Sequence, residues 1–197
     1  MKTALWVILT AVFSNNFVLS RQLGVCPMLG TARRLDSSAA MSAAVTAVMV
    51  LATAICWPLH HFILLPQGME YMQTTAFILV IALLVQGLDG LFKKRWPQFH
   101  KAFGIYLPLI TSNCAVLGVV VMNIDQGLSY GLSLLHSLAA GLGFLLAMVM
   151  FAGIREKIED CDIPESFRGT ASVLIAAGIL SLSFMGFYGM AENMLGL

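Results

Sequence analysis

The sequence predicts an all-α integral membrane protein with six transmembrane helices, arranged as two inverted three-helix repeats. Three observations lead to this fold class: apolar residues dominate, charged residues are few and clustered, and short segments recur about half a chain apart. Of the 197 residues, 59% are hydrophobic and 11% are charged, with a formal net charge of +1. Soluble domains carry about 25% charged residues. The composition therefore excludes a soluble enzyme, a nucleic-acid-binding protein and a disordered chain.

The uncharged segments define the six predicted helices. They are residues 3–20, 37–69, 71–88, 102–124, 126–154 and 169–191. About 20 apolar residues cross a bilayer as a helix. The segment 37–69 is too long for one crossing, and Pro58 is expected to end its helix near Trp57, because proline removes a backbone donor and clashes with the preceding turn. We therefore predict spans near residues 3–22, 39–57, 71–91, 102–123, 131–152 and 170–190.

The first apolar segment allows two interpretations. Lys2 followed by an apolar stretch is also typical of a signal peptide. However, no small-x-small cleavage site follows, and apolar residues continue through 17–19. We therefore expect this segment to remain as the first span. The four cysteines lie far apart in the sequence, so their spacing predicts no disulfide framework.

Lysine and arginine predict how the spans are oriented. The connections after spans 1, 3 and 5 contain Arg33, Arg34, Lys93, Lys94, Arg95, Lys101, Arg155, Lys157 and Arg168. The connections after spans 2 and 4 contain neither lysine nor arginine. Because basic loops remain on the cytoplasmic side of a membrane, we predict that the first group of connections is cytoplasmic. Both termini and the second group then lie outside.

Two short matches predict that the second half of the chain repeats the first. Residues 14–19 and 112–117 are identical at four of six positions, with an offset of 98 residues. Residues 26–30 and 114–118 share the pattern C-x-x-L-G, with an offset of 88. Either register relates spans 1 and 4, which run in opposite directions, so the repeat is inverted. One membrane domain, 1–197, would contain repeats of about 1–95 and 96–197.

The stretch 3–32, which includes span 1 and is uncharged except for Arg21, and span 4 contain polar residues and helix breakers. These residues are Asn15, Asn16, Gly24, Pro27, Gly30, Pro108, Thr111, Ser112 and Asn113. Such residues are tolerated where the backbone is buried in protein or lines a cavity. We therefore predict that both spans are broken into half-helices, with Asn15 and Asn16 as candidates for a polar or ion path. The alternative is that the amides only bond neighbouring helices.

Cys26 and Cys114 are the candidate metal ligands, and no catalytic residue is predicted. Both are followed by x-x-Leu-Gly, and glycine lets the backbone approach an inorganic sulfide and donate to it. A 2Fe–2S cluster takes four ligands, so two thiolates need two more from another chain, because Cys56 and Cys161 are badly placed. The alternative is two packed cysteines. The expected surroundings of the cluster are Gly24, Pro27, Gly30, Asn113 and Gly118.

Asp89 is a further candidate for an ion path. An acidic residue at membrane depth marks such a path by default. Lys93 lies four residues later and offers Asp89 a structural partner on the same helix. Both interpretations stay open at this point.

Three segments resemble a known family. Residues 15–19, 23–27 and 104–118 are similar to the small six-span subunits of two related redox complexes, the Rnf ferredoxin:NAD ion-translocating complex and the sodium-pumping NADH:quinone complex Nqr. Residues 76–82 and 167–169 also fit, so the resemblance covers nearly the whole chain. The Asn-Asn-Phe-Val-Leu and Cys-Pro forms are most similar to the A-type subunits of Rnf.

The resemblance implies a non-autonomous subunit of a redox-driven translocase in the bacterial inner membrane. It implies an inverted paralogous partner of the E type, with Cys26 and Cys114 supplying half the ligands of a shared 2Fe–2S cluster. Electron transfer would be coupled to Na⁺ or H⁺ movement. Partner subunits of the B, C, D and G types would handle nucleotide, flavin and ferredoxin, since this chain lacks a G-x-G-x-x-G fingerprint. The alternative is a small secondary transporter or a structural membrane subunit without cofactor.

Overall fold

The computed structural model describes residues 16–31, 35–68, 70–95, 113–159, 161, 164 and 169–195. Within these ranges the chain forms helices and turns, with no strand. The elements are α2 (Val25–Thr31), α3 (Leu35–Leu59), η2 (His60–Leu64), α4 (Leu65–Gln67), η3 (Glu70–Met72), α5 (Gln73–Arg95), α8 (Cys114–Asp125), α9 (Tyr130–Glu159) and α10 (Thr170–Leu195). The first half of each of the predicted spans 1 and 4 lies outside the described residues.

Three described helices are long and apolar enough to cross a membrane. They are Ser38–Leu64, Gln73–Gly90 and Tyr130–Ile158, at the positions of the predicted spans 2, 3 and 5. The shorter apolar helices Cys114–Asp125 and Thr170–Gly186 fall within the predicted spans 4 and 6. The described part therefore agrees with an all-α protein that crosses the membrane several times.

The prediction that a helix ends near Trp57 is wrong. Helix α3 continues through Pro58 to Leu59, and a π-helical turn, η2, carries it to Leu64. Proline lacks a backbone N–H and interrupts the hydrogen bonds of an α-helix. A π turn pairs residues five apart, so the backbone groups after Pro58 can still form hydrogen bonds within the helix. In apolar surroundings a complete break would leave backbone groups unpaired. The helical path ends only at Gly68, which has a left-handed φ of 63°.

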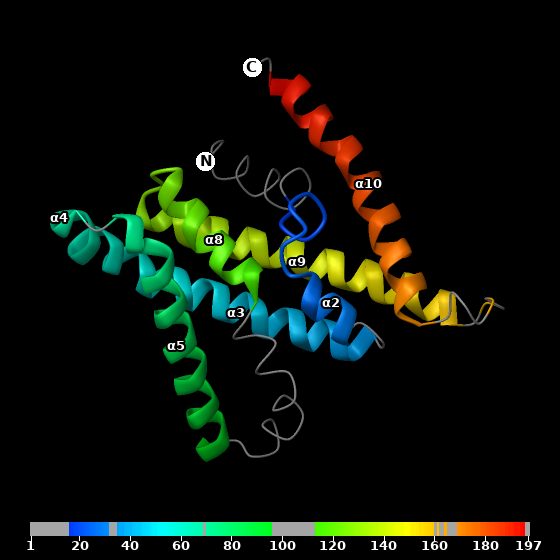
Figure 1. The fold of residues 1–197 in the computed structure, drawn as a ribbon, viewed down its shortest axis with the longest axis horizontal. Coiled ribbons are helices and arrows are strands. Elements are labelled where there is room, and N and C mark those ends of the chain that lie inside the picture. Colours follow the sequence, from blue (N-terminus) through cyan, green and yellow to red (C-terminus); the bar gives the residue numbers. More distant parts are fainter. Residues whose placement is uncertain are drawn as a thin grey trace.

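Helices α3 and α9 form the centre of the fold, lying side by side along most of their lengths (Figure 1). Close approach is possible where small residues face each other. A Cβ atom added to Gly141 of α9 would clash with the side chain of Thr46 on α3. Larger buried side chains fill the remaining space, and they include Met41, Val45, Met49, Ala52, Phe144, Met148 and Phe151.

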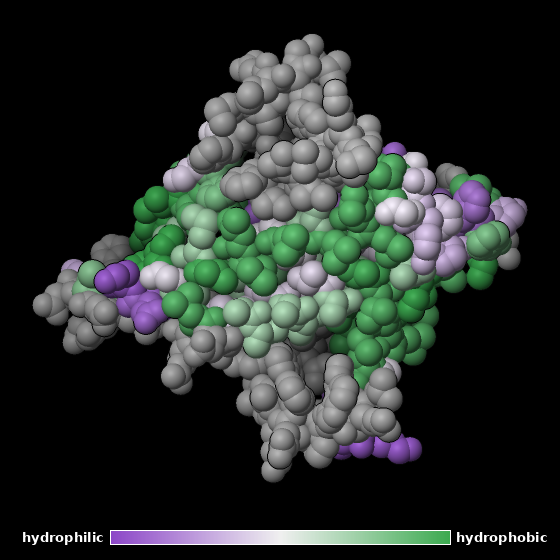
Figure 2. Space-filling view, turned by 180° about the vertical axis from the view of Figure 1, so that it is seen from behind, coloured by the Kyte–Doolittle hydropathy of each residue, from purple (hydrophilic) through white to green (hydrophobic). Residues whose placement is uncertain are grey.

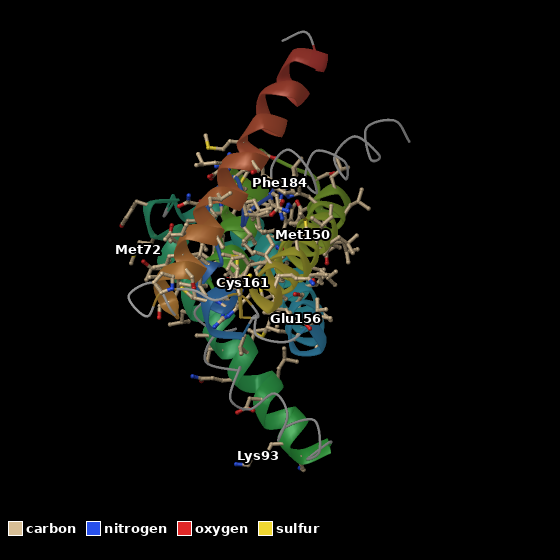
Figure 3. The ribbon with its side chains drawn as sticks, turned by 90° about the vertical axis from the view of Figure 1, so that its right-hand side faces the viewer. Met72, Lys93, Met150, Glu156, Cys161 and Phe184 are labelled. Atoms are coloured by element: carbon tan, nitrogen blue, oxygen red, sulfur yellow. The ribbon has the colours of Figure 1, made fainter. Side chains whose placement is uncertain are left out.

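The other elements surround this pair. Helix α8 packs against α3, α5 and α9, and α10 contacts α9 and α2. Helix α5 extends away from the centre, with Lys93 at its far end (Figure 3). Hydrophobic residues cover the middle of the face in Figure 2, and hydrophilic residues gather towards its ends. Exposed apolar side chains on α5 and α10 suit contact with lipid or a partner, and they include Ile78, Leu79, Leu83, Ile175, Ile179 and Leu182.

Two hydrogen bonds identify which connections share an end of the molecule. Arg155, near the end of α9, donates from Nη1 to the carbonyl oxygen of Leu29, at 3.0 Å. Trp57, near the end of α3, donates from Nε1 to the carbonyl oxygen of Leu128, at 3.0 Å. The chain after α2 and the chain after α9 therefore start at one end, and the connections after α3 and α8 start at the other. The distribution of basic residues predicts the same grouping.

Candidate functional site

Cys114 is the first residue of α8, and Asn113 determines that start. Asn113 has an extended backbone (φ −72°, ψ 109°), and its Oδ1 accepts a hydrogen bond from the backbone N–H of Ala115, at 3.0 Å. A side-chain oxygen that accepts from the first turn is the usual N-cap of a helix. The helix therefore begins in the middle of the predicted span 4, which places the Cys114 thiol at a helix start.

Asn16 forms a similar turn before α2. Its Oδ1 accepts from the backbone N–H of Val18, at 3.1 Å, and its Nδ2 donates to the carbonyl oxygen of Gly143 on α9, at 2.9 Å. Asn16 is fully buried. It therefore attaches the turn segment 16–24 to α9, which is the structural use of a membrane amide. Asn15, the other candidate for an ion path, lies outside the described residues.

Gly24 brings the segment of Cys26 against Cys114. Its backbone N–H donates to the Cys114 Sγ, at 3.1 Å. Its φ of +86° favours glycine, and an added Cβ would lie 2.9 Å from Cε2 of Phe144 and 3.1 Å from Cβ of Ala115. Both conformation and space therefore require glycine here. The backbone two residues before Cys26 therefore contacts Cys114, which is 90 residues away in the sequence.

The two thiols differ in exposure. Cys26 lies in the first turn of α2 and is exposed, whereas Cys114 is half-buried. Asn113, the residue before Cys114, is 3% exposed, and its buried Nδ2 has no hydrogen-bond partner in the described part of the chain. Among the described residues, no three histidine, cysteine or acidic side chains gather as a metal site. The site therefore offers two soft ligands and two amide donors, and it is open on the side of Cys26.

The remaining predicted site residues have different surroundings. Pro27 is buried in α2 and Gly30 is exposed. At Gly118, an added Cβ would lie 2.7 Å from the Cδ1 of Leu23, so this glycine allows the turn segment 16–24 to pack on α8. Asp89 is half-buried on α5, the helix that extends away from the centre in Figure 3.

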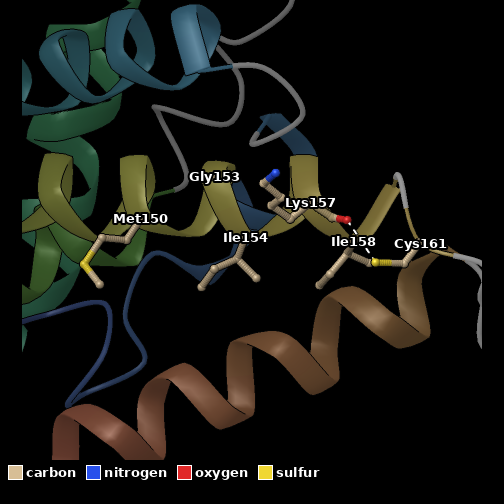
Figure 4. Close-up of a pocket in the computed structure, with 6 residues that line it drawn as sticks. All are labelled: Met150, Gly153, Ile154, Lys157, Ile158 and Cys161. Carbon is tan, nitrogen blue, oxygen red and sulfur yellow. Dashed lines mark hydrogen bonds between the residues drawn. The ribbon is translucent and has the colours of Figure 1, made fainter.

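Two other cysteines lie apart from this site. Cys56 is fully buried in the core of α3. Cys161 is exposed after α9, and its Sγ donates to the carbonyl oxygen of Lys157, at 3.3 Å. Figure 4 shows that Cys161 lies at one end of an apolar groove along α9. The groove is lined by Met150, Gly153, Ile154, Lys157, Ile158 and Cys161. Cys161 is the one cysteine among the residues that line this groove.

A buried polar network joins α3, α8 and α9, and it was not among the sequence predictions. The Oδ1 of Asn123 lies 2.6 Å from the Nδ1 of His136, and the Nδ2 of Asn123 donates to the Ser137 Oγ, at 3.0 Å. The Ser137 Oγ also lies 2.7 Å from the Oγ1 of Thr53. Because the same Asn123 Nδ2 donates to the carbonyl oxygen of Ser133, at 3.3 Å, its Oδ1 accepts from His136.

The signal for this network is present in the sequence. His136 and Ser137 follow Ser133 by three and four residues in a mostly apolar helix, so the three side chains share one face. All three are buried. Polar residues at this spacing inside a predicted span indicate bonding to neighbouring helices.

Comparisons with known proteins agree with these features. The model of the family described as "Rnf-Nqr subunit, membrane protein" matches residues 4–191. A protein of Syntrophotalea carbinolica, named as the A-type subunit of an ion-translocating oxidoreductase complex, is 49% identical over 98% of this chain and 100% of its own length. Another, of Acetobacterium woodii, is named as the A-type subunit of a Na(+)-translocating ferredoxin:NAD(+) oxidoreductase complex. It is 45% identical over 95% of this chain and 98% of its own length.

A third relative extends the agreement. The A-type subunit of the ion-translocating oxidoreductase complex of Yersinia enterocolitica is 46% identical over 92% of this chain and 94% of its own length. The family match therefore includes both cysteine segments and nearly every described helix. The chain belongs to the Rnf-Nqr family of membrane subunits.

Proposed function

We propose that this chain is the A-type membrane subunit of an Rnf-type ion-translocating oxidoreductase complex, and that Cys26 and Cys114 hold half of a 2Fe–2S cluster within the membrane. The names of relatives similar over nearly their full lengths support the first part. The hydrogen bond from Gly24 to the Cys114 Sγ supports the second, because it brings the two cysteine segments into one site.

The donor set fits such a cluster. Iron–sulfur clusters are held by thiolates and tuned by hydrogen bonds to sulfur. Gly24 already donates to one of the thiols. The buried Nδ2 of Asn113 has no partner among the described residues, and such a group normally has one. A sulfur atom of the cluster next to Cys114 would be that partner.

The site also requires a second chain. Two thiols are half of the four ligands that a 2Fe–2S cluster takes. The exposure of Cys26 leaves this side open to a partner surface. An inverted paralogue of the E type would supply the other two thiols, so the cluster would lie between the two chains. Six spans in two inverted repeats suit such a pair, since Cys26, in the segment after span 1, and Cys114, in span 4, each lie in the first turn of a helix.

The residues of this chain hold and shield the cluster, and the cluster supplies one-electron transfer. Phe144 and Ala115 lie against Gly24, so they exclude water from the inner side of the site. A carrier within the membrane divides a hydrocarbon thickness of about 30 Å into two shorter electron transfers. This chain is inactive alone, and subunits of the B, C, D and G types bind nucleotide, flavin and ferredoxin.

Ion movement is coupled to this electron transfer through the turn segment 16–24. The segment contacts Cys114 through Gly24 and α9 through Asn16, so a change at the cysteines reaches the helices of the centre. Reduction of the cluster would favour one of two positions of the half-helices. The transported ion is Na⁺ or H⁺; the relative from Acetobacterium woodii is named for Na⁺. The complex lies in the bacterial inner membrane, with both termini of this chain outside.

Electron paramagnetic resonance of the purified, dithionite-reduced complex tests the cluster. Cys26→Ala and Cys114→Ala are each expected to remove the same 2Fe–2S signal and about two iron atoms per complex. Cys56→Ala and Cys161→Ala are the matched controls, and both are expected to keep signal and iron. An unchanged spectrum and iron content in the first pair would contradict the cluster. The chain would then be a transporter or structural component with packed cysteines.

A further inference from the structure

A buried arginine contacts the end of the helix that carries Cys26. Arg155 lies on α9 and is 8% exposed. Its Nη1 donates to the carbonyl oxygen of Leu29, at 3.0 Å. Leu29 follows Cys26 by three residues on α2, which is about 4.5 Å along the helix axis. Because helix carbonyl groups point towards the C-terminus, the guanidinium lies beyond Leu29, at the end of α2 opposite Cys26.

Helix α2 depends on contacts of this kind. It has seven residues, and helices this short are unstable without tertiary contacts. The last carbonyl groups of a helix lack partners within it and carry its partial negative charge, so a cation stabilises that end. The turn segment 16–24, which precedes α2, has a contact of its own: Ser181 of α10 donates to the carbonyl oxygen of Leu19, at 2.6 Å. The hydrogen bond from Ser181 has a neutral donor, whereas the hydrogen bond from Arg155 has a charged donor.

We propose that Arg155 is a positioning residue for Cys26, and that its charge raises the reduction potential of the cluster. This role rests on the proposed function, because the charge acts on a cluster held by Cys26 and Cys114. Reduction adds one negative charge to the site, and a nearby buried cation stabilises the reduced form more than the oxidised form. The basic-residue pattern alone assigns Arg155 only to membrane orientation. The contact with Leu29 adds a second role.

Three variants of the full complex separate charge from geometry. Arg155→Gln removes the charge, and its shorter side chain reaches less far towards the Leu29 carbonyl. Arg155→Lys keeps the charge and loses the planar, forked donor group. Lys157→Gln is the matched control, since Lys157 is an exposed cation two residues later on the same helix. The measurement is a redox titration of the 2Fe–2S resonance, with assembly of the complex measured alongside.

Arg155→Gln is expected to lower the midpoint potential, Arg155→Lys to restore most of it, and Lys157→Gln to leave it unchanged. An assembled Arg155→Gln complex with the wild-type potential would overturn the electrostatic role. Loss of assembly in both Arg155 variants, with normal assembly of Lys157→Gln, would overturn it too, because the residue would then be required before any cluster is bound.

A second readout distinguishes failure of the role of Arg155 from failure of the proposed function. If the wild-type complex has no 2Fe–2S signal, the proposed function is wrong, and the positioning role is judged by the rate at which a maleimide labels Cys26. Arg155→Gln is then expected to change that rate several-fold, with Arg155→Lys and Lys157→Gln closer to wild type. Equal rates in all variants would overturn the positioning role.

Discussion

At the scale of single residues, Gly24 and Asn113 control how the Cys114 thiol is presented. Gly24 supplies an N–H to the sulfur from a backbone conformation with φ of +86°. Asn113, the residue before Cys114, starts the helix with its Oδ1, and its buried Nδ2 has no hydrogen-bond partner among the described residues. Both residues act through local geometry, so a substitution at either position is expected to disturb the site.

Gly24→Ala is expected to disrupt the site. Positive φ alone costs a non-glycine residue about 1–3 kcal/mol, and the new Cβ would also collide with Phe144 and Ala115. The matched control is Gly127→Ala, because Gly127 has a φ of +61° and open space around its Cβ position. The readout is the 2Fe–2S resonance per assembled complex. Equal loss in both variants would contradict a specific role for the close packing at Gly24.

At the scale of elements, the packing of α3 on α9 supports the site. Segment 16–24 is attached to α9 through Asn16 and Gly143, and α2 is attached through Leu29 and Arg155. The position of Cys26 therefore depends on α9, which itself is held by α3. Small residues along this contact and the polar network at its side are the two features that maintain it.

Gly141→Ala is expected to destabilise the pairing of α3 and α9. The added methyl group would overlap with Thr46, and overpacking a close contact costs about 1–3 kcal/mol. Gly153→Ala is the control on the same helix, since nothing lies within 4 Å of its Cβ position. Thermal unfolding of the purified complex in detergent measures the difference. A wild-type midpoint for Gly141→Ala would show that the helices separate at little cost.

Asn123→Ala is expected to weaken the contact of α8 with α9. It leaves the Nδ1 of His136 without its acceptor and removes the donor to Ser137. A buried polar group left unsatisfied costs about 1–3 kcal/mol. Ser183→Ala is the control, because its hydroxyl donates within α10 and is exposed. Thermal unfolding is again the measurement, and equal midpoints for the two variants would show that the network adds no stability.

At the scale of the whole molecule, the two ends have different chemistry. The ring of Trp57 lies 5.2 Å from the ring of His61 and 5.3 Å from the ring of Tyr130, which forms an aromatic cluster at the end that is poor in basic residues. The other end contains Arg155 and Lys157. Aromatic residues favour the membrane–water interface, and basic residues favour the cytoplasmic side. The distribution therefore predicts one orientation.

Cysteine labelling in whole cells tests this orientation. A cysteine introduced at Ser129, in the exposed turn before α9, is expected to react with a membrane-impermeant maleimide. A cysteine introduced at Lys93, at the exposed end of α5, is expected to react only after the cells are permeabilised. The chain without either added cysteine gives the background from the native thiols. The reverse pattern would invert the predicted topology.

The sequence determined the membrane class, the positions of the described apolar helices and the two cysteine segments, because these depend on composition, charge and local pattern. Tertiary structure decided what depends on distant contacts. Gly24 meets Cys114 across 90 residues and Arg155 meets Leu29 across 126. Tertiary structure also decided that the helix continues past Trp57. Proline is a local signal, whereas the need to pair every backbone group in apolar surroundings arises only in the folded chain.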